Sequence, residues 1–166
     1  MGDDGARQLS PIFARRTIRR DRQSGGYQVN LSSQDREVLR NLAPQFSALL
    51  DDPDQPVLRR LFPPAYSDAS QVEKEEEYRR LMREDLVAHH RAELDLLAAT
   101  ADSKVLTEEQ LLGWSRALNS LRLVLGTFLD VTEDDEQQAP RTPEESLYHW
   151  LTFILGETIE ALAAEA

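Results

Sequence analysis

TEEQLLGWSRALNSLRLVLGTFLDV, residues 107–131, is the stretch that decides the fold, because it predicts one long amphipathic α-helix. Thr107 is followed three residues later by Gln110, which is the spacing of a capping box at a helix start. Apolar side chains then recur at steps of three and four, as one face of a helix requires. They are Leu111, Trp114, Leu118, Leu121, Leu125 and Phe128.

A second set of side chains in this helix lies off that apolar face. Leu112 and Leu123 project there, beside Asn119, Arg122 and Gly126. A helix that is apolar nearly all round is buried on more than one face, so this one is either central in a bundle or half of a dimer interface. Gly126 costs about 1 kcal/mol relative to Ala, which favours a close approach by another backbone. A buried Arg122 would need a carboxylate partner.

Three further helices are predicted on either side of this one. The first runs from Ser32 to Asp52 and contains Pro44, which is expected to kink or split it. The second runs from about Ser70 to Thr100. The last begins at Thr142-Pro143-Glu144-Glu145, a second capping box with proline at the first helical position, and ends near Ala163. The apolar face of the second helix is expected to comprise Tyr78, Leu81, Met82, Leu86, Leu94 and Leu97.

The N-terminal part reads as β structure. Two short extended runs flank Gly25-Gly26, as in a hairpin. We therefore predict a mainly α protein, a helical bundle of about four to five helices with a short N-terminal β-hairpin. The chain forms a single domain, 1–166, in which 7–31 form the hairpin and 32–166 the bundle.

Composition narrows the classes of function. The chain has 166 residues, a formal net charge of −11 and no cysteine, which excludes disulfides, thiolate zinc sites and thiol redox switches. It has no apolar run of about 18 residues and no secretory signal, so we expect a cytoplasmic protein without a membrane partner. Six arginines against one acid lie within 7–22, and five of the seven residues in 130–136 are acidic. Such segments are either solvated or meet partners of opposite charge.

Two segments resemble a known family. They are Trp114-x-x-Ala117-Leu118-Asn119-Ser120-Leu121-Arg122-Leu123-Val124-Leu125-Gly126 and Arg60-Leu61-Phe62-Pro63-Pro64-Ala65-Tyr66, the latter followed by Glu77-Tyr78-Arg79-Arg80-Leu81. The chain resembles, over nearly its whole length, an actinobacterial family catalogued as a domain of unknown function and described as AosR-like. The resemblance implies a transcriptional regulator of the oxidative-stress response that acts alongside an alternative sigma factor. Some members are thought to sense oxidants through a disulfide, and this chain has no cysteine for it. Family-typical positions are Trp114, Asn119, Arg122 and Gly126, to which the resemblance assigns no role.

Motifs for catalysis are absent from the sequence. No glycine-rich phosphate loop or nucleophile elbow occurs, so we expect no enzymatic activity, no catalytic residue and no cofactor. Asp85, His89 and Glu93 recur at four-residue spacing on one helical face, which could present metal ligands. A solvent-facing trio is the simpler interpretation, so no metal site is assigned.

Three hypotheses follow. The leading one is a non-enzymatic regulatory protein that contacts a sigma factor or other transcription machinery through its charged segments and forms a homodimer through residues 107–131 or the last helix. The second is a DNA-binding regulator that uses Arg15, Arg16, Arg19 and Arg20. The third is a metal- or small-molecule-binding helical protein centred on Asp85, His89 and Glu93.

Overall fold

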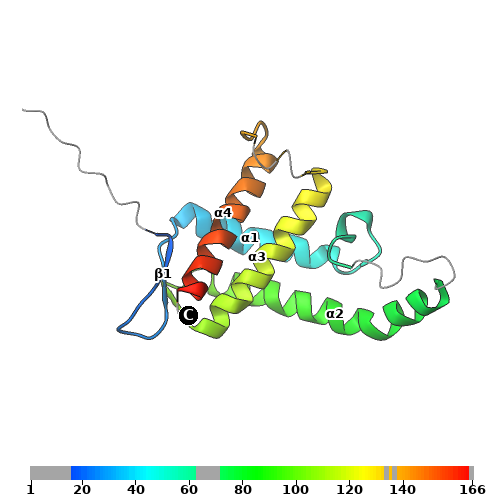
Figure 1. Ribbon diagram of the computed structural model, residues 1–166, viewed down its shortest axis with the longest axis horizontal. Coiled ribbons are helices and arrows are strands. Elements are labelled where there is room, and N and C mark those ends of the chain that lie inside the picture. Colours follow the sequence, from blue (N-terminus) through cyan, green and yellow to red (C-terminus); the bar gives the residue numbers. More distant parts are fainter. Residues whose placement is uncertain (1–15, 63–71, 133–134, 136–137, 165–166) are drawn as a thin grey trace, which may run out of the picture.

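Four α-helices, one 3-10 turn and a small antiparallel sheet make up the part of the chain that the computed structural model describes, residues 16–62, 72–132, 135 and 138–164 (Figure 1). The helices are α1 (Ser33–Leu49), η1 (Pro56–Leu58), α2 (Val72–Thr100), α3 (Glu108–Phe128) and α4 (Pro143–Ala163), and the strands are β1 (Ile18–Arg20), β2 (Tyr27–Val29) and β3 (Val105–Leu106). The predicted mainly α fold with an N-terminal hairpin is confirmed. Residues 7–15 of the predicted hairpin, Arg15 among them, lie outside the described residues.

The helix starts are where local sequence places them. The Ser32 side chain accepts a hydrogen bond from the Asp35 backbone N–H, and Thr107 does the same for Gln110, each completing a capping box. Thr142 accepts from the Glu145 N–H, but the Glu145 carboxylate accepts from the Arg141 N–H. Each cap satisfies an amide that the helix leaves without a partner, which fixes the first turn.

Contrary to the expectation from the sequence, Pro44 does not split the first helix. Helix α1 continues through it from Ser33 to Leu49, with Pro44 exposed on the outer surface. The neighbouring Leu39, Leu42 and Ala43 are buried. The packed apolar face therefore holds together a helix that lacks one backbone donor.

The sheet contains a strand that the sequence did not reveal. Its order is β1-β2-β3, with Tyr27 opposite Leu106 and Ile18 opposite Val29. Both β3 residues lie in the link between α2 and α3. Because β3 pairs with β2, the hairpin is hydrogen-bonded to the helical part of the chain. Ile18, Tyr27 and Val29 are accordingly part of the single core.

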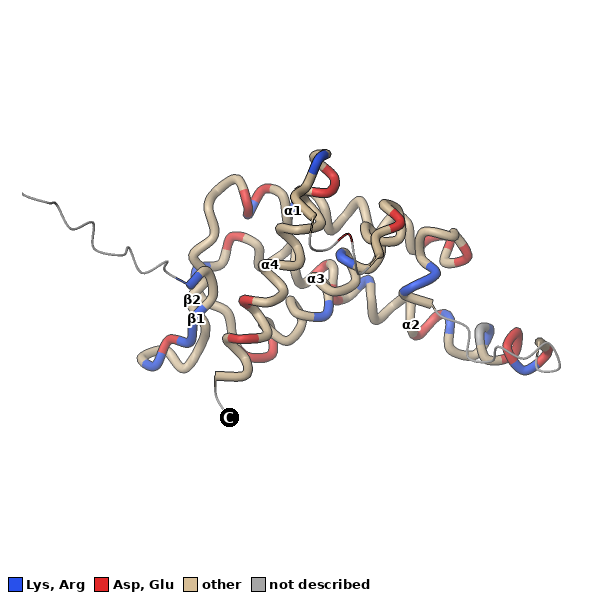
Figure 2. The backbone as a smooth tube through the Cα atoms, turned by 45° about the horizontal axis from the view of Figure 1, so that its top comes forward, with Lys and Arg blue, Asp and Glu red and all other residues tan. Residues whose placement is uncertain are grey.

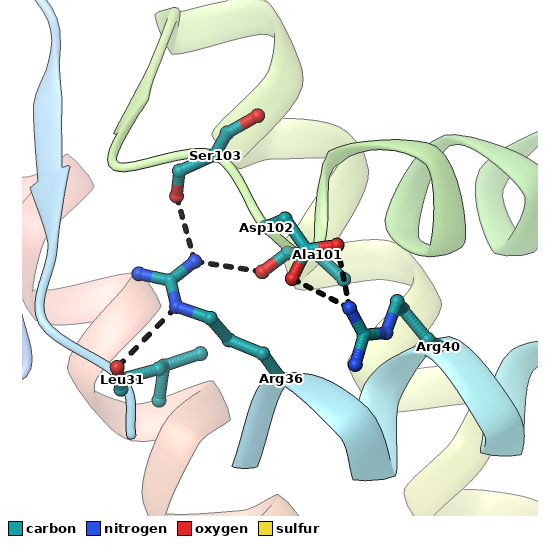
Figure 3. Close-up of polar contacts among 6 residues, drawn as sticks. All are labelled: Leu31, Arg36, Arg40, Ala101, Asp102 and Ser103. Atoms are coloured by element: carbon teal, nitrogen blue, oxygen red, sulfur yellow. Dashed lines mark hydrogen bonds and ion pairs between the residues drawn. The ribbon is translucent and has the colours of Figure 1, made fainter. Parts of the chain in front are cut away.

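Arg36 on α1 joins the hairpin, α1 and the α2–β3 link (Figure 3). Its Nη1 donates to the carbonyls of Ala101 and Ser103 at 2.7 and 2.8 Å, and its Nη2 and Nε donate to Val29 and Leu31 at 2.8 and 3.3 Å. One guanidinium thus satisfies four backbone carbonyls from two distant segments.

Helix α3 is central in the bundle, which was one of the two arrangements that its sequence allowed. It packs against α4, α2 and η1, and in Figure 1 α3 and α4 run side by side. Yet Leu112 is exposed and Leu123 only half-buried. The second apolar side of α3 is therefore only partly covered by the described residues.

The first half of α2 departs from the prediction. Leu94 and Leu97 are buried as expected, but Tyr78, Leu81 and Met82 are exposed, since α2 extends beyond the other helices (Figure 1). Tyr78 and Met82 line a groove of about 340 Å³ beside Phe62, whereas Leu81 is 68% exposed on another face. Within the described residues, no helix combines the length and apolar character needed to cross a bilayer.

Candidate functional site

Two of the family-typical positions on α3 hold the fold together. Trp114 is completely buried, and its indole N–H donates to the Thr100 hydroxyl on α2 at 2.7 Å. A Cβ at Gly126 would lie 2.9 Å from Cε2 of Tyr148 on α4 and 3.2 Å from the Arg60 guanidinium. The close approach inferred for Gly126 exists, but the nearest atoms belong to the side chains of Tyr148 and Arg60 of the same chain, and not to a second backbone.

The other two family-typical positions face outward. Asn119 is exposed, and the half-buried Arg122 lies over the Tyr148 ring, 5.3 Å from its centroid. Arg122 Nε donates to the Thr152 hydroxyl at 3.0 Å. These two contacts, with an aromatic face and with a hydroxyl, help to hold a partly solvated guanidinium in place.

Basic residues are concentrated at the sheet. Figure 2 shows Lys and Arg along β1 and the turn that follows it. The described members, all exposed, are Arg16, Arg19, Arg20 and Arg22; together we call them the arginine hairpin. Arg19 donates twice to the Gln28 side chain, at 2.6 and 2.9 Å, and Arg20 lies 5.7 Å from the centre of the Tyr27 ring.

Acidic residues lie next to the arginine hairpin. Glu157 on α4 accepts a hydrogen bond from the Thr17 N–H at 2.7 Å, and Glu160 lies 3.7 Å from Arg16. At the tip, Asp21 accepts from the Ser24 hydroxyl and the Gln23 N–H, which hold the pKa of Asp21 below its ordinary value. The surface is therefore basic with fixed negative charges at both ends. Such a mixture suits a protein surface better than the uniform charge of a phosphate backbone.

Two acids of the segment 130–136 are described. Asp130 has a positive φ of 52° and lies 3.6 Å from Arg59. The Asp135 carboxylate accepts from both the hydroxyl and the N–H of Thr132, which lowers the pKa of Asp135. Both side chains are exposed.

A buried acid lies between α2 and α3. The Glu93 side chain is 9% exposed, and its Oε1 lies 3.0 Å from His89 Nε2 and 3.9 Å from Arg116 Nε, without an aligned hydrogen bond. Burial raises the pKa of Glu93, and the charges of His89 and Arg116 only partly oppose the rise. Burial also lowers the pKa of His90.

This cluster lacks the geometry of a catalytic triad. His90 Nδ1 lies 3.3 Å from the Ser120 hydroxyl and 3.8 Å from Glu93, so serine and acid approach the same ring nitrogen. A triad uses the two nitrogens separately. The adjoining cavity has a volume of about 10 Å³, room for about one water.

The trio proposed for a metal does not assemble. His89 and Glu93 meet, but Asp85 stays exposed one turn away. No set of three or more His, Cys, Asp or Glu side chains converges as metal ligands within the described part of the chain.

The outer surface of α4 is a feature that sequence reasoning did not single out. Phe153 and Ile159 are 55% and 53% exposed, on either side of Gly156, where an added Cβ would meet nothing within 4 Å. Residues three or four apart share a helix face. That spacing unites Phe153, Gly156 and Ile159 with Thr152 and Glu160, none of them buried. We call these five residues the α4 outer face; their spacing around Gly156 was the signal in the sequence.

Comparison with known proteins identifies the family without supplying a role. No curated protein and no solved structure matches the chain. One family model, described as Domain of unknown function (DUF2017), matches residues 15–162, which include the sheet, α1, α2, α3 and all of α4 except its last residue. The chain therefore belongs to the DUF2017 family.

Proposed function

We propose that the protein is a non-enzymatic, AosR-like regulator of the oxidative-stress or transcription response, which acts by binding a sigma factor or another component of the transcription machinery. The arginine hairpin carries the proposal. Four exposed arginines project from one end of a chain whose net charge is −11, so they form a local positive surface on an acidic protein. An acidic protein surface is the complementary partner.

The position of the arginine hairpin supports this role. Strand β1 is joined to the core through β2 and β3, and Arg36 ties the end of β2 to α1 and to the α2–β3 link. The arginines are therefore held by a rigid support, which lowers the entropy lost when a partner binds. Because the chain has no cysteine, regulation by this member proceeds without thiol-based sensing.

Affinity capture from a nuclease-treated native lysate tests the proposal. The bait is compared with a hairpin variant in which Arg16, Arg19, Arg20 and Arg22 are replaced by Gln. The matched control replaces four exposed arginines elsewhere, Arg40, Arg59, Arg80 and Arg141, so both variants have the same net charge. Recovery of a sigma factor or polymerase subunit by wild type and control, but not by the hairpin variant, supports the proposal. Equal recovery by all three contradicts it.

DNA binding by the same arginines is the second candidate, because they are exposed on a β-ribbon, a shape that enters DNA grooves. It predicts promoter binding that falls steeply with salt, because each contacted phosphate releases counterions. Glu157 and Glu160 beside β1 oppose such binding. No binding at low salt would eliminate this candidate.

A further inference from the structure

We infer that the α4 outer face binds a second copy of this chain, with the two α4 helices antiparallel and crossing at Gly156. The inference deepens the proposed function by assigning the copy-to-copy surface, and it leaves the arginine hairpin for the regulatory partner. Phe153 and Ile159 are the large apolar side chains on this face, and each is more than half exposed.

Helix geometry makes the face complementary to itself. In an antiparallel pair centred on Gly156, a residue n positions after the glycine lies opposite the residue n positions before it. Ile159 of one copy therefore lies opposite Phe153 of the other, and this contact occurs twice about the two-fold axis. Gly156 leaves open space between these two contacts, so the helix backbones can approach closely there.

Charge complementarity favours a second copy over an unrelated partner. One step further from the centre, Glu160 of one copy lies opposite Thr152 of the other, and Thr152 is hydrogen-bonded to Arg122. The pairing thus brings Arg122 and Glu160 together across the contact, again twice. The Glu160–Arg16 pair is 3.7 Å long and more than half exposed on both sides, so it competes weakly for the carboxylate.

Net charge points to the same contact. Two copies that each carry −11 repel one another over most of their surface. On the α4 outer face Glu160 is the one charged residue, and Arg122 adjoins the face. Opposite charges would therefore meet in register where the copies touch.

Disulfide trapping tests the contact and its register, because the chain has no cysteine of its own. Phe153→Cys and Ile159→Cys are prepared as separate proteins and oxidised alone and mixed. Six residues of helix separate the two positions by about 9 Å, beyond the roughly 7 Å between Cα atoms that a disulfide spans. An antiparallel contact therefore gives cross-linked dimers mainly in the mixture. Leu81→Cys, exposed on α2, mixed with Phe153→Cys is the control.

The expected result is at least several-fold more cross-link in the Phe153→Cys and Ile159→Cys mixture than in either protein alone or in the control. Sedimentation of the wild type, which needs no variant to fold, should show dimers forming between micromolar and near-millimolar concentration. A wild type that stays monomeric over this range overturns the inference, as does equal cross-linking in all samples. A monomer that still binds the transcription partner through the arginine hairpin would leave the proposed function standing.

Discussion

The three glycines within α3 and α4 give a quantitative prediction, because the same substitution should have opposite effects at different positions. Replacing glycine with alanine inside a helix gains about 1 kcal/mol of helix stability. At Gly156 an added Cβ meets nothing within 4 Å, so Gly156→Ala should realise the full gain. For a chain of this size that raises Tm by roughly 2–4 °C. At Gly126 the Cβ would lie 2.9 Å from the buried Tyr148 ring, and overpacking costs about 1–3 kcal/mol. Gly126→Ala should therefore lower stability by up to about 2 kcal/mol.

Urea denaturation at low micromolar concentration, where the monomer dominates, measures both differences. Gly113→Ala provides a third point, since its Cβ would meet the terminal Cδ2 of Leu96, which can move more easily than a ring. We expect the free energy of unfolding to decrease in the order Gly156→Ala, wild type, Gly126→Ala. At high concentration the order of the first two should reverse, because the added methyl holds apart two helices that cross at Gly156. A Gly156→Ala protein less stable than wild type at every concentration would refute the reasoning.

Three further predictions follow from the contacts described above. Arg36→Met leaves four backbone carbonyls without their donor and should lower the free energy of unfolding, measured in urea, by about 3 kcal/mol. Arg40→Met removes an exposed ion pair and should lower it by less than about 1 kcal/mol. Equal losses would contradict the anchoring role of Arg36. Because burial raises the pKa of Glu93, the folded state keeps a proton that the unfolded chain has released. The stability advantage of Glu93→Gln over wild type should therefore grow as the pH rises from about 4.5 through the raised pKa. A pH-independent difference, measured by urea denaturation at several pH values, would be inconsistent with this. Arg122→Glu and Glu160→Arg should each weaken the dimer alone and restore it when mixed, since the mixed dimer regains both ion pairs; sedimentation showing no heterodimer in the mixture would argue against the register.

Short-range chemistry made the helices predictable. Each capping residue bonds an amide only three positions away, so the starts of α1, α3 and α4 could be placed from Ser32, Thr107 and Thr142. Strand β3 could not be found, because two residues carry no periodicity and become a strand only by pairing with β2. The role of Arg36 was hidden for the same reason, since its carbonyl partners come from two distant segments.

The glycines and the exposed part of α2 show why the candidate site was harder to predict. Gly126 and Gly156 look alike in sequence, yet one accommodates the Tyr148 ring and the other faces open space. Periodicity likewise places Tyr78, Leu81 and Met82 on an apolar face, but it does not say whether another element reaches that part of the helix. Only the tertiary packing decides which apolar residues remain available to a partner.

The most direct test of the proposed function is titration of the purified alternative sigma factors of the source organism, free of nucleic acid, with the wild type, the hairpin variant and its charge-matched control. The account predicts saturable binding to one of them, an affinity reduced about tenfold or more in the hairpin variant, equivalent to at least about 1.4 kcal/mol, and little change in the control. Binding that is equal for all three proteins, or no binding by the wild type to any sigma factor or polymerase subunit, would contradict a regulator that acts through its arginine hairpin.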